Sequence, residues 1–182
     1  MSAIADRYRN LAGLFTAKVA AVPEERWGDP SPCAGWTALG VVQHVAETQG
    51  MFLGFVGQRV PDAPAVADDP LGAWSAARDS VQDALDDPAV ATMTFEGLFG
   101  TTSFEQAVDR FLSFDLVVHG WDLARATGLD ERIDPVEVRR LTEQAPSFGD
   151  AMRGPGAFGP ELDAPGGADE QARLLAFLGR RA

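Results

Sequence analysis

The two histidines of this 182-residue chain lie on the apolar faces of expected helices, and one has a carboxylate one turn away. His44 lies in the run VVQHVAETQGMFLGFV, and His119 lies in DRFLSFDLVVHGWDLARATG. Asp115 precedes His119 by four residues, so both side chains project from one face of a helix. Such groups on a buried face are costly unless an ion or a hydrogen bond compensates them. Together with His44 from a second helix, they predict a three-ligand site for a divalent metal.

The chemistry of this donor set points to a transition metal. Three protein ligands are typical of catalytic zinc sites, which keep a fourth position open for water or substrate. Two imidazoles and one carboxylate suit Zn, Ni, Fe(II) or Mn, and the sequence does not choose among them. The competing interpretation is that each histidine is a hydrogen-bonded core residue. The pairing of Asp115 with His119 favours the metal, because a buried carboxylate needs a neutralising charge.

Three further side chains have roles that the sequence leaves open. Asp122 lies one turn beyond His119 and is either a fourth ligand, an orienting partner of a ligand, or a structural group. Glu47 lies one turn after His44 and is expected to be solvated. Cys33 precedes the second expected helix and is either an acidified thiol or an inert buried one. No catalytic residue is assigned, since no histidine is left over to act as a general base.

Long amphipathic segments must position these groups. Apolar residues recur at spacings of three and four, and the flanking residues include N-cap signals and the terminator Pro23. The chain between 90 and 102 fits either a short hairpin or an ordered loop. Shorter helices are expected from Pro135 to Ala145 and in the closing run EQARLLAFLG. The four long helices are predicted over about 2–22, 37–58, 71–85 and 103–127.

This pattern predicts an all-α fold, a four-helix bundle with added C-terminal pieces. We expect one domain over residues 1–182, with the bundle core at about 2–128 and a C-terminal extension at about 129–182. In the second helix, the residues expected to face inward are Val41, His44, Val45, Thr48, Met51, Phe52 and Phe55.

Composition excludes several classes of partner. The chain has 15 Lys plus Arg against 27 Asp plus Glu, a formal net charge of −12, which disfavours nucleic acid and anionic membranes as partners. No apolar run reaches the length that spans a bilayer, and the first ten residues do not read as a signal peptide. The single Cys33 excludes an internal disulfide. These features predict a cytoplasmic protein.

The segments around both histidines resemble a known superfamily. PCAGWTALGVVQHVAE is similar to the PC-x-x-W…H entry to helix two in the DinB-like metal-binding superfamily. DLVVHGWDLARATG resembles its fourth-helix signature in the branch that includes the mycothiol-dependent maleylpyruvate isomerase metal-binding domain. The closing EQARLLAFLGR looks like the end of small actinobacterial proteins of that branch. The resemblance implies a DinB-like four-helix bundle with one long crossover connection.

The resemblance also implies a site and an activity. In the isomerase, zinc is held by positions that correspond here to His44, Asp115 and His119, although the isomerase type has Glu where this chain has Asp115. A thiol-dependent transferase or isomerase is implied, with mycothiol as the thiol, the metal favouring its thiolate, and a small-molecule electrophile as partner. The alternatives are a non-catalytic metal-binding or sensor module and a metal-dependent hydrolase. Bundles of this type often form homodimers, although nothing in this sequence marks an interface.

Overall fold

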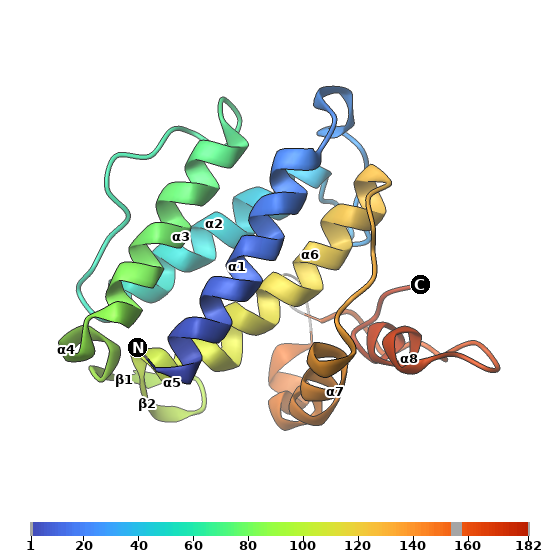
Figure 1. Ribbon diagram of the computed structural model, residues 1–182. Coiled ribbons are helices and arrows are strands. Elements are labelled where there is room, and N and C mark those ends of the chain that lie inside the picture. The colour runs from blue at the N-terminus through green and yellow to red at the C-terminus, as the bar shows by residue number, and fades with distance from the viewer. Residues whose placement is uncertain (1, 154–157, 182) are drawn as a thin grey trace. The chain divides into compact units, whose positions relative to one another are not determined.

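The computed structural model describes residues 2–153 and 158–181, and the chain divides into two compact units, residues 1–131 and 132–182. The long helices all belong to the first unit and lie side by side (Figure 1). The predicted all-α four-helix bundle is therefore confirmed. Its four helices are α1 (Ala3–Ala21), α2 (Ala38–Phe55), α3 (Pro70–Asp86) and α6 (Ser113–Thr127).

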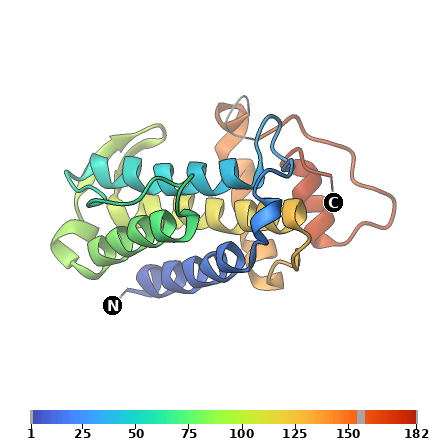
Figure 2. The same cartoon turned by 90° about the horizontal axis from the view of Figure 1, so that it is seen from above.

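The order of the helices around the bundle follows from their packing partners. Both α1 and α2 pack against α3 and against α6, so α1 and α2 face each other across the bundle (Figure 2). The connection 56–69 runs back along the bundle, so that α2 and α3 point in the same direction (Figure 1). This is the long crossover that the family resemblance implies. It also makes α2 and α6 neighbours, and these are the two helices that carry the predicted ligands.

Capping residues fix where the first helices begin and end. The hydroxyl of Ser2 accepts a hydrogen bond from the Ala5 backbone N–H, and Thr37 caps α2 through the N–H of Gly40. The second helix ends at Phe55, earlier than the predicted end near residue 58. Gly57 has φ +70°, a left-handed conformation that favours glycine and turns the chain out of the helix.

Residues 90–102, for which the sequence allowed either a short hairpin or an ordered loop, include most of a β-hairpin. Strands β1 (Thr94–Gly97) and β2 (Gly100–Ser103) pair antiparallel, with Thr94 opposite Ser103. Ser103 then caps α5 (Phe104–Ala107) through a capping box with Gln106. Two short helical turns, η1 (Glu24–Arg26) and α4 (Pro88–Ala91), complete the connections of the first unit.

The predicted fourth helix, 103–127, is not one regular α-helix. Between α5 and α6 lies a π-helical turn, η2 (Val108–Leu112). A π turn contains more residues than an α turn, so it changes the angle between the faces on its two sides. Beyond it, α6 is buried on nearly all sides, because it packs against both α1 and α2.

Aromatic and polar contacts join the bundle helices in the core. Phe15 of α1 meets the ring of Trp74 of α3 edge to face, at 4.9 Å between centroids. Tyr8 of α1 donates a 2.8 Å hydrogen bond to Oε1 of Gln49 on α2, and both residues are fully buried. Burial raises the pKa of the Tyr8 phenol, which therefore stays neutral and donates.

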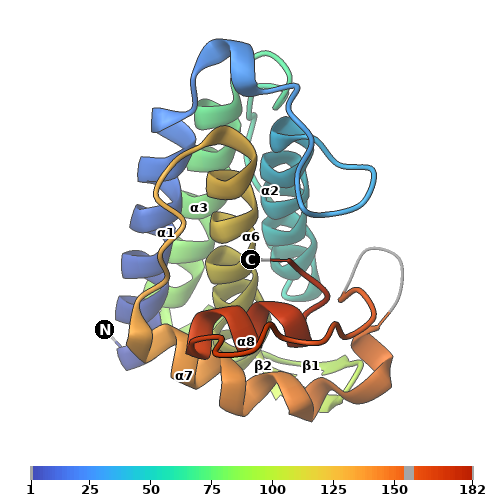
Figure 3. The ribbon, with the colours of Figure 1, turned by 90° about the vertical axis from the view of Figure 1, so that its right-hand side faces the viewer.

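The second unit is built from shorter pieces. Asp134 caps α7 (Pro135–Gln144), which is followed by η3 (Ala145–Met152) and α8 (Glu170–Phe177), and α7 packs against both (Figure 3). The core of this unit includes Val138, Leu141, Phe148, Leu174, Leu175 and Leu178. Whether the two units act as the single domain expected from the sequence stays a prediction. No helix in the described ranges is long and apolar enough to cross a membrane.

Candidate metal centre

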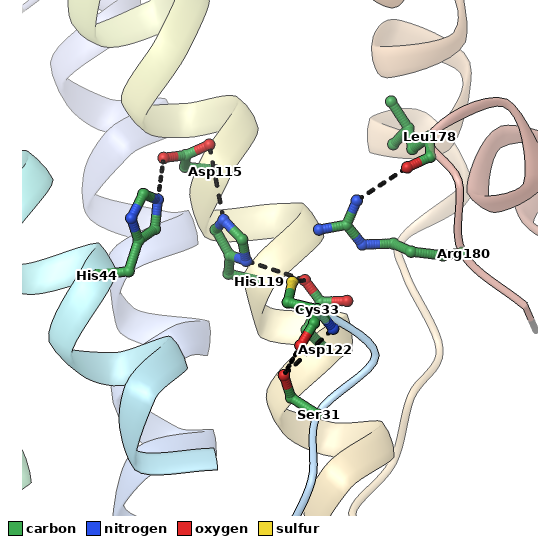
Figure 4. A network of polar contacts seen from close by, with 8 residues as sticks. All are labelled: Ser31, Cys33, His44, Asp115, His119, Asp122, Leu178 and Arg180. Atoms are coloured by element: carbon green, nitrogen blue, oxygen red, sulfur yellow. Dashed lines mark hydrogen bonds and ion pairs between the residues drawn. The ribbon is translucent and has the colours of Figure 1, made fainter. Parts of the chain in front are cut away.

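The structure brings the three predicted ligands together at the seam between α2 and α6 (Figure 4). Nε2 of His44 lies 3.5 Å from Oδ2 of Asp115, and Nε2 of His119 lies 4.0 Å from its Oδ1. One ligand atom from each of the three residues falls within 4.8 Å of the others. The two imidazole rings lie at 71° to each other, with centroids 4.9 Å apart. Both rings therefore direct a nitrogen at one carboxylate.

The spacing of these atoms fits a first-row metal after a small inward movement. Ligands about 2 Å from a tetrahedral zinc ion lie roughly 3.3 Å from one another. The side chains of His44 and Asp115 are each 26% exposed, whereas that of His119 is 9% exposed. One side of the cluster is therefore accessible, as a site with an open coordination position requires.

Asp122 sets the hydrogen-bonding state of His119. Its Oδ2 lies 2.9 Å from Nδ1 of His119, and the Asp122 side chain is fully buried. The carboxylate accepts the Nδ1–H, so that in the neutral ring Nε2 carries a lone pair directed towards Asp115. A lone pair and a carboxylate repel each other unless a cation lies between them. Within the described part of the chain, the two histidines are the basic side chains within 4.0 Å of the Asp115 carboxylate.

Cys33 extends this network from the loop before α2. Its thiol donates a hydrogen bond to Oδ2 of Asp122 at 3.3 Å, and Cys33, His119 and Asp122 form a second group whose geometry could accept an ion. The 2.9 Å distance between Nδ1 and Oδ2 is that of a direct hydrogen bond and shorter than the spacing of two ligands on one ion. We therefore interpret the second group as support for His119.

The remaining residues singled out by the sequence lie at the edge of the site or outside it. Trp36 packs beside both imidazoles, with its ring centroid 4.6 Å from that of His44 and 5.7 Å from that of His119. Glu47 is exposed and accepts a 2.8 Å hydrogen bond from Gln43. Trp121 is buried in the core, next in sequence to Asp122.

The expected inward face of α2 needs one correction. Met51 and Phe55 are 53% and 48% exposed, whereas the fully buried face of α2 includes Val42 and Gln49, which were not expected there. His44 and Thr48 are only partly buried. The periodicity is right, but the buried stripe is rotated, because α2 packs against α3 on one side and α6 on the other. His44 therefore lies at an edge of the bundle rather than at its centre.

Comparison with known proteins supports the same family as the motifs. The family described as the mycothiol maleylpyruvate isomerase N-terminal domain matches residues 8–124, a range that includes all three predicted ligands. Two curated relatives from Mycobacterium tuberculosis, the uncharacterized proteins MT0763 (strain CDC 1551 / Oshkosh) and Rv0738 (strain ATCC 25618 / H37Rv), are each 30% identical over 168 residues. The alignment covers 91% of this chain and 91% of each relative.

A solved structure supports the fold. The crystal structure of a mutant of the mycothiol-dependent maleylpyruvate isomerase superposes with a TM-score of 0.53 at 15% sequence identity. The match covers 83% of this chain and 72% of that one. At this identity the likeness concerns the fold, whereas membership rests on the family match and the curated relatives. The chain belongs to the mycothiol maleylpyruvate isomerase N-terminal domain family.

Proposed function

We propose that this protein is a divalent-metal-dependent enzyme that uses mycothiol, or a closely similar small thiol, in a transfer or isomerisation reaction. The observation that carries the proposal is the convergence of His44, Asp115 and His119 on one point. Membership of a family named for a mycothiol-dependent isomerase supports the choice of thiol. The accessible side of the cluster supports catalysis over a closed structural metal site.

The described residues have separable roles in this proposal. His44 and His119, each through Nε2, and one oxygen of Asp115 would hold the ion. When bound, a divalent cation would lower the pKa of a thiol that reaches it and so supply the nucleophile at neutral pH. Asp122 keeps the ring of His119 oriented by accepting its Nδ1–H. Trp36 shields one side of both imidazoles from water.

Zinc is the first choice of metal, and Ni, Fe or Mn are alternatives that two imidazoles and one carboxylate also accept. Metal analysis of protein purified without a polyhistidine tag decides among them. A cytoplasmic location suits the proposal, because small thiols are kept reduced there.

A thiol-conjugation assay tests the proposal. Metal-loaded wild-type protein is compared with His44→Ala and His119→Ala, and with Glu47→Gln as a matched control outside the site. We expect turnover in the wild type and in Glu47→Gln, and only the uncatalysed rate in the two histidine variants. Equal turnover in all four proteins would rule out a role for the metal in the reaction.

The two alternatives receive less support from the geometry. A non-catalytic metal-binding module would be favoured if Asp122 were a fourth ligand that filled the open coordination position. Asp122 instead contacts Nδ1 of His119, whereas Nε2 of that ring faces the ligand cluster. A hydrolase would need Glu47 or Asp122 as a proton acceptor near bound water. Glu47 is exposed and paired with Gln43, and Asp122 accepts hydrogen bonds from His119 and Cys33. Ester hydrolysis without added thiol would support the hydrolase instead.

A further inference from the structure

The π turn η2 determines which face of α6 is directed at α2. In η2 the backbone N–H of Ser113 bonds to the carbonyl of Val108, five residues earlier, so the turn contains one residue more than an α turn. Each residue of an α-helix adds a rotation of about 100°. The additional residue therefore turns every side chain of α6 by about that angle, compared with an uninterrupted continuation of α5.

This rotation decides which side chains of α6 reach His44. In an uninterrupted helix, the positions that Asp115 and His119 now occupy would be taken by the residues that precede them. Those residues are Phe114 and Val118, which are apolar and buried in the structure. A regular α-helix would therefore present a phenyl ring and an isopropyl group to His44 in place of the two predicted ligands.

A contact from α1 stabilises the π turn. A π turn is rare and interrupts the regular ladder of backbone hydrogen bonds, so a donor from outside the helix can stabilise it. Nη1 of Arg7 donates to the backbone carbonyl of Asp109 at 3.3 Å and to Oδ1 of the same residue at 2.7 Å. The Arg7 side chain is 11% exposed, so the ion pair is partly shielded from water. Because Asp109 lies within η2, one guanidinium binds both the backbone and a side chain of the turn.

We propose that Arg7 is a positioning residue for the candidate metal centre. By binding the carbonyl and the carboxylate of Asp109, it holds η2 in the π conformation. This conformation keeps Asp115 and His119 directed towards His44. The inference rests on the proposed function only in taking these three residues as one metal site. Without Arg7, a fraction of the molecules turns the α6 ligands away, and the apparent metal affinity falls in proportion to the fraction that remains competent.

Zinc affinity, measured by competition with a chelator, is the first test. Arg7→Ala and Asp109→Ala are compared with Arg9→Ala, which removes an ion pair between α1 and Asp86 of α3. We expect the Kd of Arg7→Ala to rise about tenfold, as when a tenth of the molecules stay competent. Asp109→Ala keeps the carbonyl and should show a smaller rise, and Arg9→Ala should match the wild type. Unchanged affinity in Arg7→Ala, or an equal loss in Arg9→Ala, would overturn the inference.

A deletion separates an effect on the π turn from a general loss of stability. Removing Arg110 shortens η2 by one residue, so the segment can continue as a regular α-helix with Asp115 and His119 on the same face as before. In this background Arg7 has no π turn to hold. Adding Arg7→Ala to the deletion protein should therefore leave its zinc affinity unchanged. The same loss of affinity in both backgrounds would mean that Arg7 acts on the stability of the bundle, and would overturn the inference.

Proton NMR of the metal-free protein separates this inference from the proposed function. The ring of Trp36 lies beside the imidazoles of His44 and His119, so its ring current shifts their signals. Trp36 directly precedes the N-cap of α2, whereas His119 lies on α6, so a rotation of α6 changes the His119 signals more than those of His44. We expect this selective change in Arg7→Ala but not in Arg9→Ala.

The two readouts then give distinct outcomes. A selective change of the His119 signals in a protein that binds no zinc would overturn the proposed function, but would support the role of Arg7 in directing His119. Signals that are the same in Arg7→Ala and in the wild type would overturn the inference and leave the proposed function intact.

Discussion

At the residue scale, the candidate ligands could be found in the sequence because helical spacing is a local property. The four-residue interval alone places Asp115 and His119 on one face of a helix. His44 joins them when the helix that carries it packs beside that face. The support from Cys33 and Trp36 is of another kind, because both lie in the loop before α2. A loop has no periodicity from which contacts with α6 can be inferred. The role of Asp122 on α6 was left open for a different reason, because helical spacing does not say which nitrogen of His119 the carboxylate meets.

The contact between Asp122 and His119 predicts a change in metal affinity. In Asp122→Asn, the ligands remain, but a neutral amide replaces the carboxylate that accepts the Nδ1–H of His119. Loss of such a partner typically weakens metal binding about 10- to 100-fold. Competition titration with a zinc chelator measures the affinity, with Glu47→Gln as the control. Unchanged affinity in Asp122→Asn would mean that its hydrogen bond does not support a metal ligand.

At the scale of elements, caps and apolar periodicity predicted the bundle helices and most of their boundaries. The sequence did not reveal the π turn η2, because one additional residue in a turn shifts the spacing of the apolar residues only slightly. It also misplaced the buried face of α2. Apolar residues occur around most of that helix, so the choice of buried face depends on where α3 and α6 pack.

The buried hydrogen bond between α1 and α2 predicts a measurable stability cost. Gln49 accepts from Tyr8 through Oε1, while its Nε2 has no partner among the described residues. In Tyr8→Phe the Oε1 atom also loses its donor, which should cost about 1–3 kcal/mol of the free energy of unfolding. Urea denaturation monitored by circular dichroism measures this cost.

A double variant isolates the hydrogen-bond contribution. Tyr8→Phe combined with Gln49→Leu removes both polar groups, and we expect it to be closer to wild-type stability than Tyr8→Phe alone. Gln49→Leu is measured as the second single variant. If the loss of stability in the double variant equalled the sum of the losses in Tyr8→Phe and Gln49→Leu, the contact between these side chains would contribute nothing to the free energy of unfolding.

At the scale of the whole molecule, the motifs predicted the family that the comparisons then supported. That the net charge of −12 disfavours nucleic acid as a partner stays a prediction. The division at residue 131 did not follow from the sequence, which was interpreted as one domain. Gly128 ends α6 in a left-handed conformation, three residues before the last residue of the first unit. Compact units are defined by contacts between residues that are distant in sequence. Helical periodicity and capping patterns are local, so they do not predict those contacts.

Metal binding should raise the stability of the folded chain. A ligand that binds only the folded state adds about 2.7 kcal/mol at a concentration 100 times its Kd. We expect zinc to raise the Tm of wild type in differential scanning calorimetry and to leave that of Asp115→Asn nearly unchanged. A chelator should reverse the effect in the wild type. An equal shift in both proteins would place the binding of zinc elsewhere in the molecule.

The crossover connection 56–69 has a consequence for how the protein could be divided. It separates the helix that carries His44 from the helix that carries Asp115 and His119, and most of its residues are exposed. A cut there yields two fragments, each with an incomplete ligand set and an uncovered apolar face. Such fragments should reassociate. Added zinc should lower the dissociation constant of the fragment complex, because the ion binds side chains from two polypeptides that are no longer covalently joined.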